Sequence, residues 1–201
     1  MNTYKVLHIC GKPDWEQIPS LEVSNIQWLP DAGVRMRQQV CYDDSAFYIR
    51  QVAVENHIRA ECHAPNEQAC LDSCMEFFFC VNSEDGRYFN FEITPKGFMY
   101  LGLCKSIEDS VRLFPENYIE LFDIRPNYVL DGWELTYKIP FDFIRKYFPN
   151  FEPKPGFKFR ANCYKCGNLT VKPHYLSWNL STKPTPNFHV PEDFGEMILD
   201  D

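Results

Sequence analysis

The stretch Asp72-Ser73-Cys74-Met75-Glu76-Phe77-Phe78-Phe79-Cys80-Val81 decides the fold, together with Arg87-Tyr88-Phe89-Asn90-Phe91-Glu92-Ile93-Thr94, which follows after a polar turn. Successive side chains of a strand point to opposite faces. One face of this predicted hairpin therefore carries only apolar side chains, namely Met75, Phe77, Phe79, Phe89, Phe91 and Ile93. The other face mixes aromatic rings and thiols with Glu76 and Glu92, so the sequence predicts two acids side by side on one sheet.

The same alternation recurs along the chain and predicts further strands. They cover Tyr4–Cys10, Val34–Tyr42, Ala46–Glu55, Trp133–Ile139, Phe157–Cys163 and an apolar closing strand after Phe188. Helical spacing appears only over Phe141–Phe148, residues 56–69 form a polar loop, and residues 105–120 fit neither period. Many short strands separated by turn signals predict an all-β fold, an antiparallel β-sandwich of the immunoglobulin or jelly-roll kind with short helical excursions.

Size and charge limit the function classes. A chain of 201 residues with 45% hydrophobic residues fits one domain over 1–201, with 1–33 as a lead-in segment. The net charge of −8 argues against a nucleic-acid partner, because phosphate binding needs clustered lysine and arginine. No apolar run is long enough for a membrane helix, and the first residues lack a secretory signal. We expect a cytoplasmic protein, or a secreted one if the sequence is a trimmed form.

Nine cysteines are an odd number, and several lie inside apolar strands, which suits a reducing compartment. Cys163-Tyr164-Lys165-Cys166 is a lone CxxC pair. Zinc would need two more ligands, for which the sequence offers Cys62, His63, Cys70 and Cys74 only if the fold brings those segments together. We interpret the thiols as structural and expect no metal there. Asp43-Asp44 could hold calcium, but stabilisation of the turn is the favoured interpretation.

Five stretches, in this order, resemble the family 9 carbohydrate-binding modules and the wider group of family 9-like β-sandwich domains. They are Tyr42–Ile49, Asp72–Phe78, Tyr88–Ile93 with Gly97, Gly132–Pro140, and Trp178–Leu199 with its Phe188-His189-Val190-Pro191 segment. The resemblance covers residues 34–199. It implies a β-sandwich that grips a sugar between aromatic rings and bonds its hydroxyls with polar strand residues.

The resemblance also implies the site residues. Phe188 stands at the place of one clamping tryptophan, and the second tryptophan, expected near Ala69-Cys70, is replaced. Trp178, before the Pro-rich loop, is predicted to stack beside Phe188. The residues implied to bond hydroxyls are the strand acid Glu76, the later strand positions Arg160 and Asn162, and Glu92, which stands where an arginine is expected.

From these patterns we expect a non-catalytic domain that binds a saccharide or related polyol on the polar face of a sheet, alone or beside a carbohydrate-active enzyme. Two alternatives remain open at this point. An interaction domain would have kept the sandwich and lost the sugar site. A glycoside hydrolase would use Glu76 and Glu92 as its pair of carboxylates. Apart from that acid pair, no nucleophile elbow, phosphate loop or metalloprotease motif appears in the chain.

Overall fold

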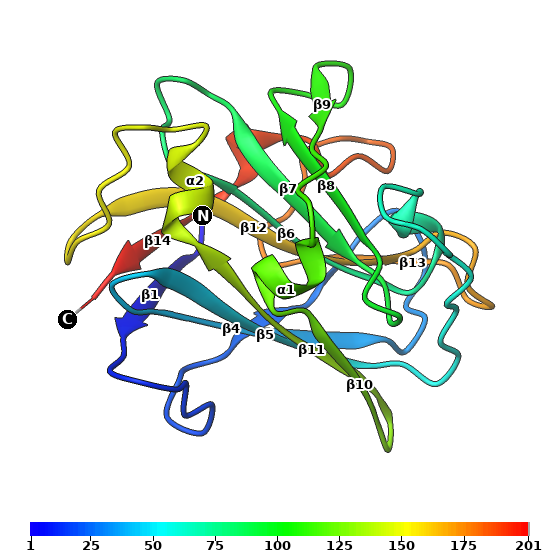
Figure 1. Cartoon of the computed structure of the whole chain (residues 1–201). Helices are drawn as coiled ribbons and strands as arrows, with labels where there is room; N and C mark the ends of the chain where they lie inside the picture. Colours follow the sequence, from blue (N-terminus) through cyan, green and yellow to red (C-terminus); the bar gives the residue numbers. More distant parts are fainter. Residues whose placement is uncertain (201) are drawn as a thin grey trace.

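The computed structural model describes residues 1–200 and consists mainly of strands that form two facing sheets (Figure 1). The first sheet contains β3 (Asn25–Ile26), β6 (Cys74–Cys80), β7 (Tyr88–Ile93), β8 (Met99–Cys104), β9 (Ser110–Arg112), β12 (Lys158–Gly167), β13 (His174–Ser177) and β14 (Gly195–Leu199). The second contains β2 (Leu21–Val23), β4 (Arg35–Tyr42), β5 (Ala46–Val54), β10 (Arg125–Val129) and β11 (Gly132–Pro140). The predicted all-β sandwich is thereby confirmed.

Strand β1 (Thr3–His8) connects the two sheets. Its first half runs parallel to β14, where Thr3 lies opposite Glu196, and its end runs parallel to β4, where Leu7 lies opposite Cys41. All other strand pairs are antiparallel, so the sandwich is mixed only at this seam. The segment 1–33, expected to be a lead-in, thus contributes β1, β2 and β3 to the sheets.

Four of the predicted strands pair into two hairpins. In the second sheet β4 and β5 pair from Arg35–Val54 to Tyr42–Phe47, and in the first sheet β6 and β7 pair with Glu76 opposite Glu92. The Asp43 carboxylate closes the β4–β5 turn, since it accepts bonds from the Ser45 and Ala46 amides at 2.7 and 2.9 Å and from the Tyr48 hydroxyl at 2.8 Å. These bonds lower the pKa of Asp43 although burial opposes them.

The interior between the sheets holds the main core. It is built from the inward positions of both sheets, as strand alternation requires. Aromatic rings dominate it, and the Phe79 ring alone contacts five others at centroid distances of 5.2 to 6.3 Å. Its largest fully buried members include Phe47, Phe77, Phe79, Phe89, Phe91, Phe122, Phe141, Phe159 and Trp133.

The outer face of the first sheet is covered rather than open to water. Strand alternation places Tyr88, Asn90 and Glu92 on this face, yet they are only 0%, 0% and 7% exposed. The reason is the C-terminal segment, residues 186–194, whose Phe188 and Phe194 pack on this face and form a second apolar cluster with the β6, β7 and β12 side chains. The C-terminal segment therefore covers the polar face of the first sheet.

Two short helices complete the fold: α2 (Phe141–Arg145), predicted from its spacing, and α1 (Tyr118–Phe122), in the stretch whose pattern fitted neither period. Single 3₁₀ turns lie at Ala69–Leu71 and Pro191–Asp193, and residues 56–68 form the expected loop. No helix within residues 1–200 has the length and apolar character needed to cross a bilayer. Strands β2, β3, β8, β9, β10 and β13 lie outside the predicted strands.

Candidate functional site

A pocket of about 170 Å³ opens on the outer face of the first sheet, beneath the C-terminal segment. Its floor comes from β6, β7 and β12, and its walls come from the loop after β3, from β13 and from the C-terminal segment. The lining residues divide into rings, acids and thiols: Trp28, Tyr175, Phe188 and His189; Glu76 and Glu92; Cys70 and Cys166. Asn168, Asn187, Pro186 and Ile107 complete the rim.

Three aromatic side chains form one wall. The Phe188 ring stacks on the buried Tyr164 ring, with centroids 4.0 Å apart and planes 16° apart. The Trp28 ring lies 5.2 Å from Phe188 and 5.5 Å from Tyr175. Trp28 and Tyr175 are half-buried, so each keeps part of its ring free for another molecule. Rings held this way can pack against the C–H face of a sugar.

Trp28 has a strained backbone conformation that neighbouring hydrogen bonds hold in place. Its φ is +59°, in the left-handed region that bulky residues rarely adopt. The flanking Gln27 amide donates to the Tyr175 carbonyl at 3.0 Å, and the Trp28 indole donates to the Lys183 carbonyl at 2.8 Å. Such strain persists only where surrounding contacts enforce it, and it concentrates at functional sites.

The floor of the pocket contains Glu76 and Glu92, which are directly opposite each other on β6 and β7. Both are buried, and their only recorded polar partners among residues 1–200 are the Cys166 thiol, 2.7 Å from Glu76, and the Asn90 amide, 2.9 Å from Glu92. Burial raises the pKa of both carboxyls, that of Glu92 to about 7, and the charge of Glu92 raises the pKa of Glu76 further. The pair therefore retains a proton near neutral pH.

A pair of carboxyls that shares a proton can both donate and accept hydrogen bonds. The Asn168 Oδ1 atom adds a buried acceptor with no partner within residues 1–200. His189 bonds the Tyr88 hydroxyl through Nδ1 at 2.8 Å, and burial lowers its pKa to about 4, so its ring is neutral. The polar part of the pocket thus suits a neutral ligand rich in hydroxyl groups.

The structure brings three of the six predicted ligand-binding residues into this pocket: Glu76, Glu92 and Phe188. The other three lie elsewhere. The Arg160 guanidinium donates to the backbone carbonyls of the C-terminal segment, including Phe194 and Glu192, and holds that segment on the sheet. Asn162 is fully buried and bonds both the amide and the carbonyl of Asn179 at 2.9 Å.

Trp178 is the third, and it occupies the interior core with 5% of its surface exposed. It follows β13 and points to the inner side of the first sheet, whereas Phe188 lies on the outer side. The two rings flank the Pro-rich loop in sequence, yet the sheet separates them. The expected Trp178–Phe188 platform does not form in this structure, and Trp28 and Tyr175 adjoin Phe188 instead.

Sequence reasoning missed Trp28, Tyr175 and Asn168. Trp28 lies in a stretch that fits neither helical nor strand spacing, and Tyr175 lies in the unpredicted strand β13. The one feature of the sequence that could have indicated Trp28 is that a large aromatic residue stands in an irregular segment that ends at a proline.

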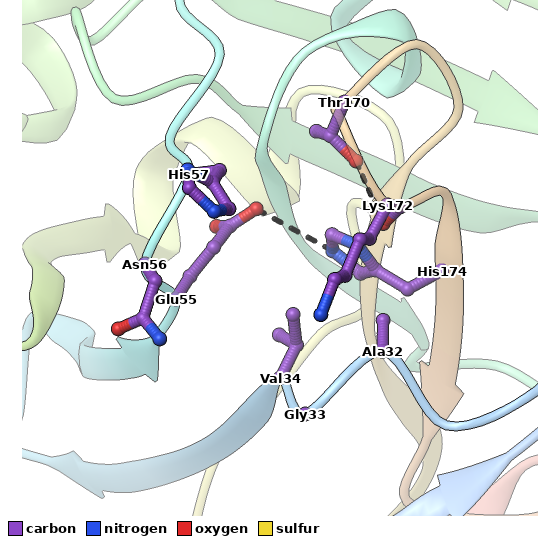
Figure 2. Close-up of a pocket in the computed structure, with 9 residues that line it drawn as sticks. All are labelled: Ala32, Gly33, Val34, Glu55, Asn56, His57, Thr170, Lys172 and His174. Atoms are coloured by element: carbon purple, nitrogen blue, oxygen red, sulfur yellow. Dashed lines mark hydrogen bonds and ion pairs between the residues drawn. The ribbon is translucent and has the colours of Figure 1, made fainter.

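A second pocket of about 170 Å³ lies at the edge of the interior, between the end of β5 and the start of β13 (Figure 2). Glu55 and His174 point toward each other across it, with 3.7 Å between Oε1 and Nε2. Behind them the buried Lys165 ammonium contacts three acceptors: the Cys166 carbonyl at 2.9 Å, His174 Nε2 at 2.8 Å and Glu55 Oε2 at 3.1 Å.

Glu55 is satisfied as well, since the Ser73 hydroxyl donates to Oε1 at 2.7 Å and the Trp133 indole to Oε2 at 3.3 Å. Burial and the charge of Lys165 lower the pKa of His174 to about 4, so its ring is neutral and accepts from the ammonium. These three groups, which we call the Lys165 network, satisfy one another. They stabilise the fold and leave no reactive group for a ligand.

Comparison with known proteins agrees with the fold. The sequence profile described as carbohydrate-binding family 9 matches residues 5–199. A candidate carbohydrate-binding protein from Bacteroides uniformis superposes with a TM-score of 0.84 at 20% identity, over 98% of this chain and 99% of that chain. No curated protein matches the sequence.

A family 9 carbohydrate-binding module from Caldicellulosiruptor kristjanssonii has been solved in complex with cellotriose and in complex with glucose. Both structures superpose with a TM-score of 0.70 at 12% identity over 99% of this chain, and over 94% and 96% of theirs. At these identities the likeness establishes a shared fold.

Proposed function

This chain belongs to carbohydrate-binding family 9, and from that premise we propose that it binds a saccharide without catalysis in the pocket of Trp28, Tyr175 and Phe188. One observation carries the proposal: an aromatic wall stands beside two buried, neighbouring carboxyls in a single small pocket. Sugars present an apolar C–H face and a rim of hydroxyls, and recognising them takes a ring surface and hydrogen-bonding groups together.

The size of the pocket favours one sugar ring. Its volume of about 170 Å³ is below the ~300–1,000 Å³ typical of sites for drug-sized ligands. The related Caldicellulosiruptor module binds both glucose and cellotriose, which share a glucose ring. A site for a terminal glucose-like ring, with the rest of the chain in solvent, follows from these two facts. Among saccharides and related polyols, the expected ligands are therefore those that offer such a ring.

The placement of the acids favours binding over hydrolysis. A glycosidase needs two carboxyls that flank the scissile bond. Glu76 and Glu92 are instead neighbours on adjacent strands and approach a ligand from the same side. The open pocket also favours sugar binding over a domain that has lost its site, since Arg160 and Glu76 are not locked together across it.

Titration calorimetry with glucose and cellotriose, in buffer that contains a chelator, tests this proposal. We expect one sugar per chain and affinities within about threefold of each other, because the second and third rings make few contacts. Trp28→Ala should weaken binding at least tenfold, a loss of ~1.4 kcal/mol.

The matched control is Trp15→Ala, which removes another half-buried tryptophan that lines no part of this pocket. It should leave the affinity unchanged. Absence of heat for glucose, cellotriose and a wider panel of sugars would refute the proposal, and so would equal losses in the two tryptophan variants.

A further inference from the structure

Strand geometry divides the CxxC pair between the two faces of the first sheet. Residues three apart on a strand point in opposite directions. Cys163 accordingly faces the interior core, while Cys166 lies in the cluster on the outer face. The two thiols of Cys163-Tyr164-Lys165-Cys166 therefore cannot bind one metal ion together.

Cys166 instead meets two potential ligands on the neighbouring strand. In the β6–β12 register Cys166 lies directly opposite Cys74, and Glu76 is on the same face of β6. The two sulfur atoms and one carboxylate oxygen all lie within 4.8 Å of one another. Within residues 1–200 this is the one such group of three ligands, and all three side chains are buried.

The three-ligand group and its neighbour Glu92 contain acidic side chains but no basic side chain that pairs with them. Glu76 lies opposite Glu92, and both carboxyls can be ionised together only if a positive charge offsets the repulsion between them. The ion pairs recorded for residues 1–200 include neither of these carboxyls. Lys165, on the neighbouring strand β12, acts on Glu76 through its charge but makes no contact with it, because it points to the interior and bonds Cys166, His174 and Glu55 there. A bound dication would supply the missing positive charge.

We propose that Cys74, Cys166 and Glu76 bind one thiophilic divalent cation of the zinc class. Two thiolates and a carboxylate are ligands that zinc takes, at ~2.3 Å for sulfur and ~2.0–2.2 Å for oxygen. These lengths place tetrahedral ligands about 3.3–3.8 Å apart, so the present spacing needs only small side-chain shifts.

The sugar pocket gives the cation a route to the three ligands and space for a fourth ligand. Glu76 and Cys166 line that pocket, and the half-buried Cys70 lines it beside them. A cation can enter from there and keep one position open to water or to Cys70. Binding deprotonates the two thiols and releases their protons to solvent, so affinity rises with pH. The cation site stands whether or not the pocket binds sugar.

Cobalt(II) titration of the reduced full-length protein tests this site. We expect a near-ultraviolet thiolate-to-cobalt charge-transfer band and visible bands of tetrahedral cobalt that saturate at one equivalent. Zinc should displace cobalt and abolish the bands. Cys166→Ser and Cys74→Ser should each weaken cobalt binding by at least ~100-fold, since removal even of an outer-shell partner costs 10–100-fold.

Cys80→Ser is the matched control, because Cys80 is a buried thiol on the same face of β6 outside the group. It should keep the wild-type bands. Should a serine variant fail to fold, Glu76→Gln keeps the shape of the pocket and should still lower affinity. Zinc should also raise the melting temperature of the wild type by mass action. A wild type without saturable bands, or bands that survive in both Cys74→Ser and Cys166→Ser, would overturn the proposal.

Discussion

Both faces of the first sheet carry buried aromatic rings, but their polar groups differ. On the inner face, the one charged set, the Lys165 network, matches every ammonium donor to an acceptor. On the outer face, two carboxyls lie side by side, and the Asn168 oxygen lacks a partner within residues 1–200. Buried polar groups normally find partners, because leaving them unpaired costs free energy. Stability alone therefore explains the charged groups of the inner face, whereas a ligand would explain the facing carboxyls of the outer face.

The largest expected effect is on the inner face. Phe79→Ala should lower the free energy of unfolding by about 3–5 kcal/mol, because it removes a fully buried ring that contacts Phe47, Phe89 and Phe159. Urea denaturation measures this loss. Sugar affinity of the folded fraction should stay at the wild-type value. A variant that keeps its stability and loses sugar binding would reverse the roles assigned to the two faces.

On the outer face, Phe188→Ala should affect sugar binding strongly and stability less. The ring borders the pocket and retains 8% exposure, so we expect a smaller loss of stability, about 2 kcal/mol. Sugar affinity should fall at least tenfold, measured by calorimetry at a temperature where the variant is folded. Phe114→Ala, at a ring that is 70% exposed, is the control and should change neither quantity. Retained affinity in Phe188→Ala would remove that ring from the site.

The Lys165 network predicts a specific pH dependence. The pKa of His174 falls from 6.5 to about 4 in the folded chain, so between these values the unfolded chain binds the proton and the folded chain does not. Stability from this residue is present above pH 6.5 and is lost as the pH falls toward 4. The stability difference between wild type and His174→Gln should therefore shrink by on the order of 2 kcal/mol over this range.

Denaturation curves at several pH values measure that difference. Subtracting the free energy of unfolding of His174→Gln from that of the wild type removes the contributions of the other titrating groups, which both proteins share. The exposed His57 is outside the network, and His57→Gln should show no comparable narrowing. A constant difference between wild type and His174→Gln would mean that His174 is not held neutral by burial and Lys165.

The smallest effect is expected at the β4–β5 turn of the second sheet, which does not line the sugar pocket. Asp43→Ala removes the acceptor for two backbone amides and should cost about 1 kcal/mol of stability, measured by thermal denaturation. Sugar affinity should be unchanged, since β4 and β5 contribute nothing to the pocket. Asp44→Ala, at a carboxylate fully exposed beside it, is the control.

The fold was largely predictable because local alternation determines which side chains face inward. The pattern around Phe77 and Phe91 was enough to predict a hairpin and to place Glu76 beside Glu92. What it could not show is that both faces of this sheet are covered. That depends on the C-terminal segment, which Arg160 holds by its backbone carbonyls, a contact between distant parts of the chain.

The site was predictable only in part, for the same reason. Phe188 and the two acids line the candidate pocket, and the resemblance and the alternation had both indicated them. Trp178 was predicted to be its partner because the two rings flank one loop, but sequence proximity does not decide the face of a sheet. Trp28 reaches Phe188 through the β3–β13 pairing, which no local period reveals.

The central claim, that a sugar binds against Trp28 on the outer face, is tested most directly by the indole N–H signals in a ¹⁵N–¹H NMR titration with glucose. The chain has four tryptophans, and their positions differ: Trp28 lines the pocket, Trp133 and Trp178 lie in the interior, and Trp15 lies near another surface. We expect the Trp28 signal to shift and saturate while the other three stay in place. A sugar that shifts the Trp178 or Trp15 signal and leaves Trp28 unmoved, or that moves none of the four, would contradict it.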